Sequence, residues 1–455
     1  MSLGLVWFRN DLRIADNEAI FKAINENEKV VFFYCLDVFW LGKTKYGFDK
    51  IGGYRLKFLV ETIEDLRENF KSKGCELVIT IGNTAERLSE LYDLYNFDNL
   101  YVQEEMTSEE IKIETKVIAE LSKKSAEFNK KVKLHKIWGL TLIHLKDLNF
   151  SFDPTSKNTL PDIFTNFRIN VEKYSKPQNL LNSEKLDLAF KNQTINLHSN
   201  KNFDWNEIKE KLSIRFKTQS PKSALNCEGG ESKALNRLKN YFYDTNSIWV
   251  YKNTRNGLIG QNYSSKFSPY LALGAISAKQ IYWELKSYEE SYGSNISTYW
   301  LYFELLWRDY FKFVAYKYGD KIFKYNGLRN KKLKLSSDMN LAKVWLDGNT
   351  KEKFVNANMI ELNESGWMSN RGRQNVASYL VHDLGIDWRI GAEYFESLLL
   401  DYDVTSNWCN WQYIAGVGND PRENRKFNIQ LQQEKYDKNQ KFIKHWLGNN
   451  MDSLF

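Results

Sequence analysis

The chain has 455 residues, a formal net charge of +7 and 42% hydrophobic residues, which suits two or three domains with buried cores. It contains no apolar run long enough for a membrane span, no basic and apolar leader, and four cysteines too scattered for a disulfide framework or a metal site. We therefore expect a cytoplasmic protein without metal or membrane association. The mild positive charge permits a polyanionic partner, and 14 Trp within a 15% aromatic content leave room for a stacking site.

Residues 1–148 alternate short apolar runs with amphipathic segments. Such alternation predicts an α/β domain with a doubly wound parallel sheet, which binds ligands at the carboxyl ends of its strands. No GxGxxG follows the first strand and no P-loop occurs, which disfavours an ordinary dinucleotide site. The expected strands are Leu3–Phe8, Val30–Leu36, Leu77–Ile81, Leu100–Val102 and Val132–Ile137, with helices near 16–27, 53–73, 84–95 and 108–125.

Two further regions follow this first domain. Residues 149–230 are rich in Asn, Lys and Ser and predict an interdomain linker with short helices. Residues 231–455 show mainly helical patterns and predict a larger all-α domain. Ser268 and Pro269 mark a helix start with a small polar cap. The expected helices are Ala234–Tyr243, Pro269–Leu285, Thr298–Tyr318, Met368–Leu384 and Ala392–Leu400.

Four segments of the helical region carry chemistry-bearing residues. Asn262–Ser268 clusters hydroxyls and a lysine before a helix, which is either a phosphate cradle or an ordinary capped loop. In the next segment, Glu304 and Arg308 are four residues apart on a strongly apolar helix, so they either pair with each other or face a cavity. Ser365–Asn375 and Asp401–Tyr413 combine charges, amides and large rings, which favours a binding site over a plain core helix.

Other readings of the sequence are weaker. Neither a G-x-S-x-G elbow nor an HExxH motif occurs, which disfavours hydrolytic chemistry. His382 is interpreted as a satisfied core histidine. The basic group at Arg329, Lys331, Lys332 and Lys334 is interpreted as a solvated face, with the rim of a nucleic-acid site as the alternative.

The same segments resemble the signature stretches of the photolyase and cryptochrome superfamily over nearly the whole chain. The resemblance begins at LVWFRNDLR (residues 5–13) and ends in residues 401–427. SSKFSP, WMSNRGRQNVAS and DYDVTSNW, followed by NWQY and AGVGNDPRE, are similar to the DASH branch in particular. The resemblance implies an all-α domain that binds a U-shaped FAD, with an Arg373–Asp401 ion pair beside the flavin ring and Asn407 facing its N5 atom. The positions matching the FAD contacts are Tyr251, Ser264, Ser265, Lys266, Phe267, Ser268, Glu304, Arg308, Asn370, Arg373, Asp401, Asp403 and Asn407.

The resemblance also implies an activity: blue-light-driven repair of cyclobutane pyrimidine dimers by electron transfer from reduced flavin. DASH-like members favour single-stranded or looped DNA, where the lesion leaves the stack at lower cost. Glu304 and Asn370 match residues that bond the dimer bases, and Trp307, Gln374 and Tyr413 match the cavity wall. We expect a monomer. Two alternatives remain open, a blue-light photoreceptor that binds nucleic acid or protein without repair and a flavoprotein oxidoreductase that works in the dark.

A second pigment and an electron relay complete what the resemblance implies. The α/β domain of the family often holds an antenna, commonly methenyltetrahydrofolate (MTHF), and Glu105 matches a folate-contacting carboxylate. The family reduces its flavin through three tryptophans, of which Trp411 and Trp388 match the inner two, whereas the outer position is Leu335. Leucine cannot relay an electron, so either another ring substitutes or photoreduction is slow. The chain also departs from the family between Lys351 and Ile360, where an Asp–Arg pair is replaced by Asn356 and Ile360.

Overall fold

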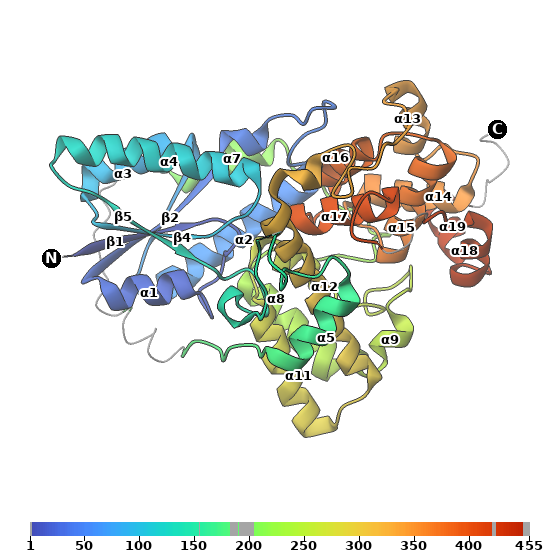
Figure 1. Ribbon diagram of the computed structural model, residues 1–455, viewed down its shortest axis with the longest axis horizontal. Coiled ribbons are helices and arrows are strands. Elements are labelled where there is room, and N and C mark those ends of the chain that lie inside the picture. Colours follow the sequence, from blue (N-terminus) through green and yellow to red (C-terminus); the bar gives the residue numbers. More distant parts are fainter. Residues whose placement is uncertain (1, 154, 183–189, 191–203, 421–424, 449–455) are drawn as a thin grey trace.

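The computed structural model describes residues 2–153, 155–182, 190, 204–420 and 425–448. A sheet flanked by helices forms one end of the molecule and a helical assembly forms the other (Figure 1). Within the described residues, no helix combines the length and apolar character that crossing a membrane requires. The expected pairing of an α/β part with a larger helical part is confirmed, whereas the boundaries at 148/149 and 230/231 stay predictions.

The sheet contains five parallel strands in the order β3-β2-β1-β4-β5. The chain begins in the middle of this sheet and winds outward first to one edge and then to the other, as in a doubly wound fold. The carboxyl ends of the strands face the helical part and form the edge where such folds bind ligands. The strands are β1 (Leu3–Phe8), β2 (Lys29–Asp37), β3 (Leu77–Gly82), β4 (Asn99–Gln103) and β5 (Lys133–Ile137).

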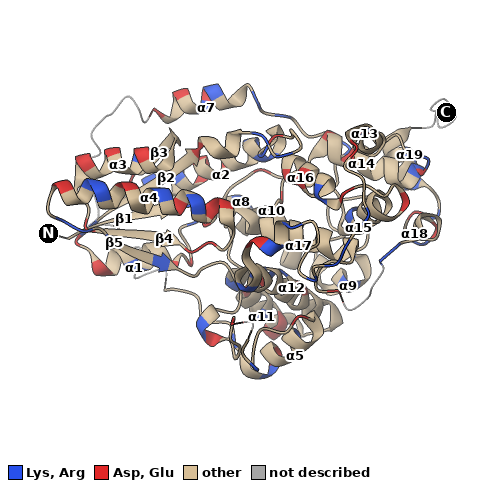
Figure 2. Cartoon of the chain, turned by 45° about the horizontal axis from the view of Figure 1, so that its top comes forward, with Lys and Arg blue, Asp and Glu red and all other residues tan. Residues whose placement is uncertain are grey.

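Helices cover both faces of the sheet. Alternate residues of β1 point to opposite faces, so Val6 and Phe8 pack with the helices α1 (Glu18–Glu26) and α2 (Gly53–Ser72). Leu5 and Trp7 pack with α3 (Thr84–Tyr95) and α4 (Ser108–Glu127). Charged residues band the outer sides of α3 and α4, as expected for amphipathic surface helices (Figure 2).

The connection after β5 contributes α5 (Phe164–Tyr174) and α7 (Trp205–Ser213), as the prediction of short helices in this region required. The weak periodicity near residues 176–204 lies largely outside the described residues. The helical part then runs through α8 (Glu231–Lys239), α9 (Tyr251–Thr254), α10 (Ser268–Leu273), α11 (Ala278–Tyr292), α12 (Ile296–Tyr318), α13 (Met339–Leu346), α14 (Lys353–Ser365), α15 (Asn370–Ser378), α16 (Trp388–Leu398), α17 (Val404–Ala415), α18 (Ile429–Tyr436) and α19 (Lys441–Leu447). Single π turns follow α8 at Asn240–Asp244 and α15 at Tyr379–Asp383.

One expected helix is wrong. Pro269–Leu285 is two helices, because α10 ends at Gly274 in the left-handed conformation (φ +67°). A Cβ at Gly274 would collide with the backbone of Asn10 and Asp11, so glycine allows the helical part to approach the sheet part. The new helix α11 begins at Ala278, after the N-cap residue Ser277, which forms a capping box with Gln280.

The segment that departs from the family pattern forms α14. Its Asn356 is buried, accepts hydrogen bonds from Thr350 N and Oγ1 (2.8 and 2.7 Å), and donates to the Thr350 carbonyl (2.8 Å). Asn356 therefore fixes the entry of its own helix. In the described residues, no side chain of residues 351–360 lines the cavities described below.

Candidate functional site

The largest concentration of predicted site residues surrounds one cavity of about 450 Å³ in the helical part. Its volume lies within the range of small-molecule and cofactor sites. Segments far apart in sequence form its walls, among them α9, the loop before α10, α12, the start of α15 and the start of α17. The predicted residues that line it are Tyr251, Ser264, Ser265, Lys266, Phe267, Ser268, Glu304, Trp307, Arg308, Asn370, Arg373, Gln374, Asp401, Asp403 and Tyr413.

The Asn262–Ser268 loop is held by Arg237, an arginine that no sequence motif singles out. Arg237 on α8 donates to the carbonyls of Gln261, Ser264 and Ser265 (3.2, 3.1 and 3.0 Å), and to Asn262 Oδ1 (2.8 Å). A guanidinium has five N–H donors in a rigid fork, so it can fix several acceptors at once. The expected Ser268 cap is wrong, since α10 is capped at Phe267 and makes no side-chain cap bond.

Lys266 is the clearest sign that this cavity takes an anion. Lys266 is 3% exposed, and its backbone has a positive φ of +59°. Its Nζ has no hydrogen-bond partner among the described residues. The ammonium lies over the rings of Tyr263 (3.5 Å) and Trp367 (4.3 Å). Burial holds the pKa of Lys266 well below its usual value. A buried donor left unsatisfied is costly, so a phosphate oxygen at this position fits the group.

Two ion pairs also line the cavity. Arg373 Nη2 donates to both oxygens of Asp401 (2.9 and 3.0 Å). Asp403 accepts from Lys312 Nζ (2.6 Å) and, as the N-cap of α17, from Ser406 N (2.8 Å). Although burial opposes ionisation, Lys312 and Arg308 hold the pKa of Asp403 far below its usual value. Two fixed carboxylates therefore stand ready to accept hydrogen bonds from N–H or O–H groups of a ligand.

Glu304 and Arg308 do not pair with each other. Arg308 donates to the carbonyls of Leu140 (2.5 Å) and Leu271 (3.1 Å), which joins α12 to the sheet part and to α10. Glu304 forms an ion pair with Arg255, another residue that sequence reasoning missed. Desolvation raises the pKa of Glu304, and Arg255 opposes the rise. Glu304 is thus a carboxylate aimed into the cavity.

Aromatic rings and arginines form the outer wall. Trp307 stacks on Phe164 (centroids 3.7 Å apart, planes at 12°) and meets Tyr413 edge-on at 6.1 Å. Arg425 lies 4.1 Å over the Tyr413 ring and, like Arg255, lines the cavity. Flat rings beside arginines suit a nucleobase and its phosphate. The last three residues of the AGVGNDPRE stretch, 421–423, lie outside the described residues.

The three remaining helical-domain residues lie deeper. Asn407 and Trp411 line an adjoining cavity of about 90 Å³ that shares Arg373, Asp401 and Asp403 with the larger one. Asn407 Nδ2 donates to the Ala392 carbonyl (3.0 Å), which leaves its oxygen to accept. Trp388 is fully buried and lines neither cavity. His382 bonds the Ile414 carbonyl (3.0 Å), in agreement with its interpretation as a satisfied core histidine.

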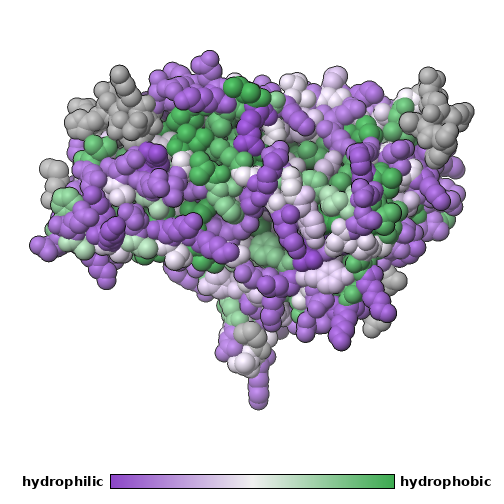
Figure 3. Space-filling model, turned by 90° about the horizontal axis from the view of Figure 1, so that it is seen from above, coloured by the Kyte–Doolittle hydropathy of each residue, from purple (hydrophilic) through white to green (hydrophobic). Residues whose placement is uncertain are grey.

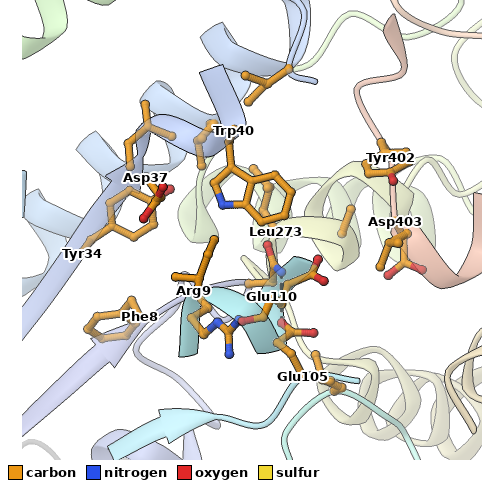
Figure 4. Close-up of a pocket in the computed structure, with 18 of the residues that line it drawn as sticks. Phe8, Arg9, Tyr34, Asp37, Trp40, Glu105, Glu110, Leu273, Tyr402 and Asp403 are labelled. Carbon is orange, nitrogen blue, oxygen red and sulfur yellow. Dashed lines mark hydrogen bonds between the residues drawn. The ribbon is translucent and has the colours of Figure 1, made fainter. Parts of the chain in front are cut away.

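A second cavity, of about 140 Å³, lies at the carboxyl ends of the strands (Figure 4). The Trp40 ring stands in its middle, with Tyr34 and Asp37 on one side and Tyr402 and Asp403 on the other. Glu105 lines this cavity and accepts from Asn10 Nδ2 (3.0 Å) and Gln103 Nε2 (3.2 Å). Seen from above, the molecule is hollowed where its two parts meet (Figure 3).

The cavity at the strand ends shares a wall with the cavity of about 450 Å³ in the helical part. Leu271, Ala272, Arg308 and Asp403 line both of them. Arg9 at the floor of the smaller cavity is paired with Glu114 (3.2 Å), and Glu110 beside it is bonded by Thr107. Burial and the neighbouring Glu105 raise the pKa of Glu110 to about 7.

Comparisons with known proteins match both parts. Residues 300–452 match the FAD binding domain of DNA photolyase, and residues 4–184 match the DNA photolyase family. These matches define a protein with the architecture of a photolyase and an FAD-binding helical domain.

Full-length relatives identify the branch. The chain is 44% identical to a Danio rerio protein named Cryptochrome DASH, over 96% of this chain and 82% of the relative. It is 42% identical to Cryptochrome DASH of Synechocystis sp., over 97% and 87%. The crystal structure of the Synechocystis sp. PCC6803 cryptochrome matches with a TM-score of 0.88 at 40% identity, covering 98% of this chain and 89% of that one. The chain belongs to the cryptochrome DASH branch of the photolyase and cryptochrome superfamily.

Proposed function

We propose that this protein is a blue-light-driven, FAD-dependent lyase that repairs cyclobutane pyrimidine dimers in single-stranded or looped DNA, acting as a monomer. One observation carries the proposal. Glu304, Asn370, Trp307, Gln374 and Tyr413, the residues expected to bind the lesion, line the same cavity as the residues expected to hold FAD. A lesion and a flavin bound there would be neighbours, as electron transfer between them requires.

The residues divide the cavity between two ligands. Lys266 and the hydroxyls of Ser264, Ser265 and Ser268 suit a diphosphate, while Arg373 and Asp401 suit a polar ring. When bound, reduced FAD excited by blue light supplies the electron that splits the cyclobutane ring. Asn407 offers an amide oxygen to a ring nitrogen, which supports the role implied for it.

The outer part of the cavity suits the flipped lesion. Glu304 accepts hydrogen bonds from base N–H groups and Asn370 can donate or accept at the base edges. Trp307 and Tyr413 meet nearly at right angles (86°), so they offer two differently oriented faces to adjacent pyrimidines. Arg255 and Arg425 provide the positive charge that a strand backbone needs.

We place the antenna in the cavity at the strand ends, with MTHF as the pigment. The acidic groups Glu105 and Glu110 support this choice, because a methenyl folate carries positive charge on its ring. The shared wall places any pigment there beside the flavin cavity. We further propose the cytoplasm, since all four cysteines are free, three of them buried, which suits a reducing compartment.

The proposal is tested on the purified protein with a single-stranded oligonucleotide that carries one thymine dimer. Flavin absorbance, followed by light-dependent recovery of thymine absorbance after dithionite reduction, is the expected result. Flavin without repair would instead support a photoreceptor, turnover of a redox substrate in the dark would support an oxidoreductase, and a protein that binds no flavin would overturn the assignment of the cavity.

A further inference from the structure

The expected relay of three tryptophans lacks its outer member in this chain. The family resemblance implies photoreduction of the flavin through Trp411 and Trp388, and this inference rests on the proposed function of an FAD-dependent, light-driven protein. Trp411 is 2% exposed and Trp388 is fully buried, so neither ring meets a reductant in solution. Leu335 occupies the position where a third indole is expected, and its side chain has no π-system to oxidise. A donor ring must therefore lie elsewhere on the path from Trp388 to the surface.

The two inner rings lie along one side of α16. A Cβ on Gly391, three residues after Trp388, would collide with the Trp411 ring, so this ring packs on the helix face that also carries Trp388. Trp388 in turn meets Trp408 of α17 at 5.7 Å, one turn from Trp411. The packing of α16 on α17 thus places both indoles at the same helix interface.

Tyr325 connects Trp388 to the missing position. The Trp388 indole Nε1 donates to the Tyr325 carbonyl (3.1 Å). The Tyr325 hydroxyl accepts from Leu335 N (2.9 Å) and lies 3.4 Å from the Leu335 carbonyl oxygen. One residue therefore contacts the middle indole through its backbone and the site of the lost indole through its phenol. Tyr325 is partly exposed, unlike Trp388.

The surroundings of Tyr325 suit a neutral oxidised form. Arg389 lies 5.0 Å over its ring, which disfavours a second positive charge there. Arg389 is itself paired with Asp387 (2.7 Å). Loss of the phenolic proton together with the electron avoids the second charge, and the partial exposure of Tyr325 gives water access to the residue.

We propose that Tyr325 is the terminal electron donor that replaces the missing outer tryptophan. In each round Trp411 would give one electron to bound, light-excited flavin, which is oxidised in the first round and one-electron reduced in the second. Trp411 would regain the electron from Trp388, and Trp388 from Tyr325. Tyr325 loses one electron to Trp388 and one proton to solvent. A thiol in solution then returns one electron and one proton to the phenoxyl group, and two rounds supply the two electrons of full flavin reduction.

A competing exit leads from Trp411 to Trp345 (6.2 Å) and on to Tyr394 (6.0 Å from Trp345). Trp345 is fully buried, and its Nε1 donates to the Val376 carbonyl (2.9 Å). Trp388 is buried and bonded to a carbonyl in the same way. The two exits therefore differ in the tyrosine at their outer end, and variants of the two tyrosines separate them. Tyr394 serves as the matched control, because it is a half-buried tyrosine on the other exit.

The test compares Tyr325→Phe, Tyr394→Phe and wild type, each loaded with FAD and illuminated with a thiol reductant. Tyr325→Phe keeps the ring but removes the oxidisable phenol, so we expect loss of most of the photoreduction rate. The tyrosyl electron paramagnetic resonance signal, identified by its change on ring-deuterated tyrosine labelling, should disappear with it. Tyr394→Phe should keep both the photoreduction rate and the tyrosyl signal of wild type. Tyr325→Trp should restore photoreduction, and Leu335→Trp in the Tyr325→Phe background should do so as well.

Two results would overturn the proposal: a tryptophan radical as the last species in wild type, or loss of the signal in Tyr394→Phe instead. The wild-type labelling experiment stands even if a variant folds poorly. Repair after dithionite reduction in the dark bypasses the relay, so Tyr325→Phe should repair normally under that condition. Failure of wild type there would count against the proposed function and not against Tyr325.

Discussion

The cavity of the helical part and the cavity at the strand ends differ in how their polar groups are satisfied. In the helical part, Lys266 is buried without a hydrogen-bond partner among the described residues, and Glu304 and the Arg373–Asp401 pair face open space. At the strand ends, Glu105 already accepts from Asn10 and Gln103, and the cavity is about 140 Å³ against about 450 Å³. The cavity of the helical part therefore holds a buried ammonium that a ligand could satisfy, whereas the carboxylate of Glu105 already has two donors from the protein.

Arg373→Ala is the variant from which we expect the largest effect on the cavity of the helical part. It leaves Asp401, whose side chain is 4% exposed, without its partner. We expect loss of bound FAD and a fall of about 3 kcal/mol in unfolding free energy, since an unpaired buried charge is costly. Flavin absorbance per protein and urea unfolding measure these effects. Lys343→Ala, which removes an exposed pair with Asp347, is the control and should change neither.

The next effect separates substrate from cofactor within the larger cavity. Glu304→Ala should lower repair roughly ten- to a hundredfold, because it removes the charged acceptor of a hydrogen bond that a base N–H group of the lesion donates. FAD should stay bound. The measurement is thymine recovery with dithionite-reduced protein, with the exposed Glu290→Ala as control. Purification of Glu304→Ala as apoprotein would contradict the assigned role.

A pH experiment tests the buried acid Glu361. Burial raises the pKa of Glu361, which lies behind the larger cavity, to about 8, although Lys266 and Arg373 oppose the rise. Because the pKa of Glu361 is higher in the folded state than in the unfolded state, the folded state binds more protons. The contribution of protonated Glu361 to stability is therefore complete at acidic pH and is lost as the pH rises toward 8. Glu361→Gln should therefore be more stable than wild type at pH 8 by about 1.4 kcal/mol or more, one pKa unit. Denaturant unfolding at pH 5 and pH 8 should show the difference shrinking at pH 5.

The smallest expected effect lies at the strand ends. Glu105→Gln keeps an oxygen that can accept from Asn10 and Gln103, so the fold should be unchanged. FAD content and repair by dithionite-reduced protein should equal those of wild type. Only the absorbance of a bound folate should be lost. A variant that loses FAD would mean that the two cavities are one functional unit.

The sequence by itself determined the parallel sheet and the residues that reach the larger cavity. The predicted bounds of strand Leu3–Phe8 agree with the structure at both ends. A parallel strand that is buried on both faces is a continuous apolar run, and polar residues mark where it ends. Asn370 and Arg373 could be placed on one face because helical spacing fixes which side chains are neighbours.

Only the tertiary structure decided the partners. Glu304 pairs with Arg255 rather than Arg308, the helix after Ser268 breaks at Gly274 to admit Asn10, and Arg237 holds a loop that begins more than twenty residues later. Each of these depends on segments distant in sequence that packing brings together, and local periodicity carries no information about them. Leu335 illustrates the same limit, since sequence shows the missing indole but only packing shows Tyr325 beside it.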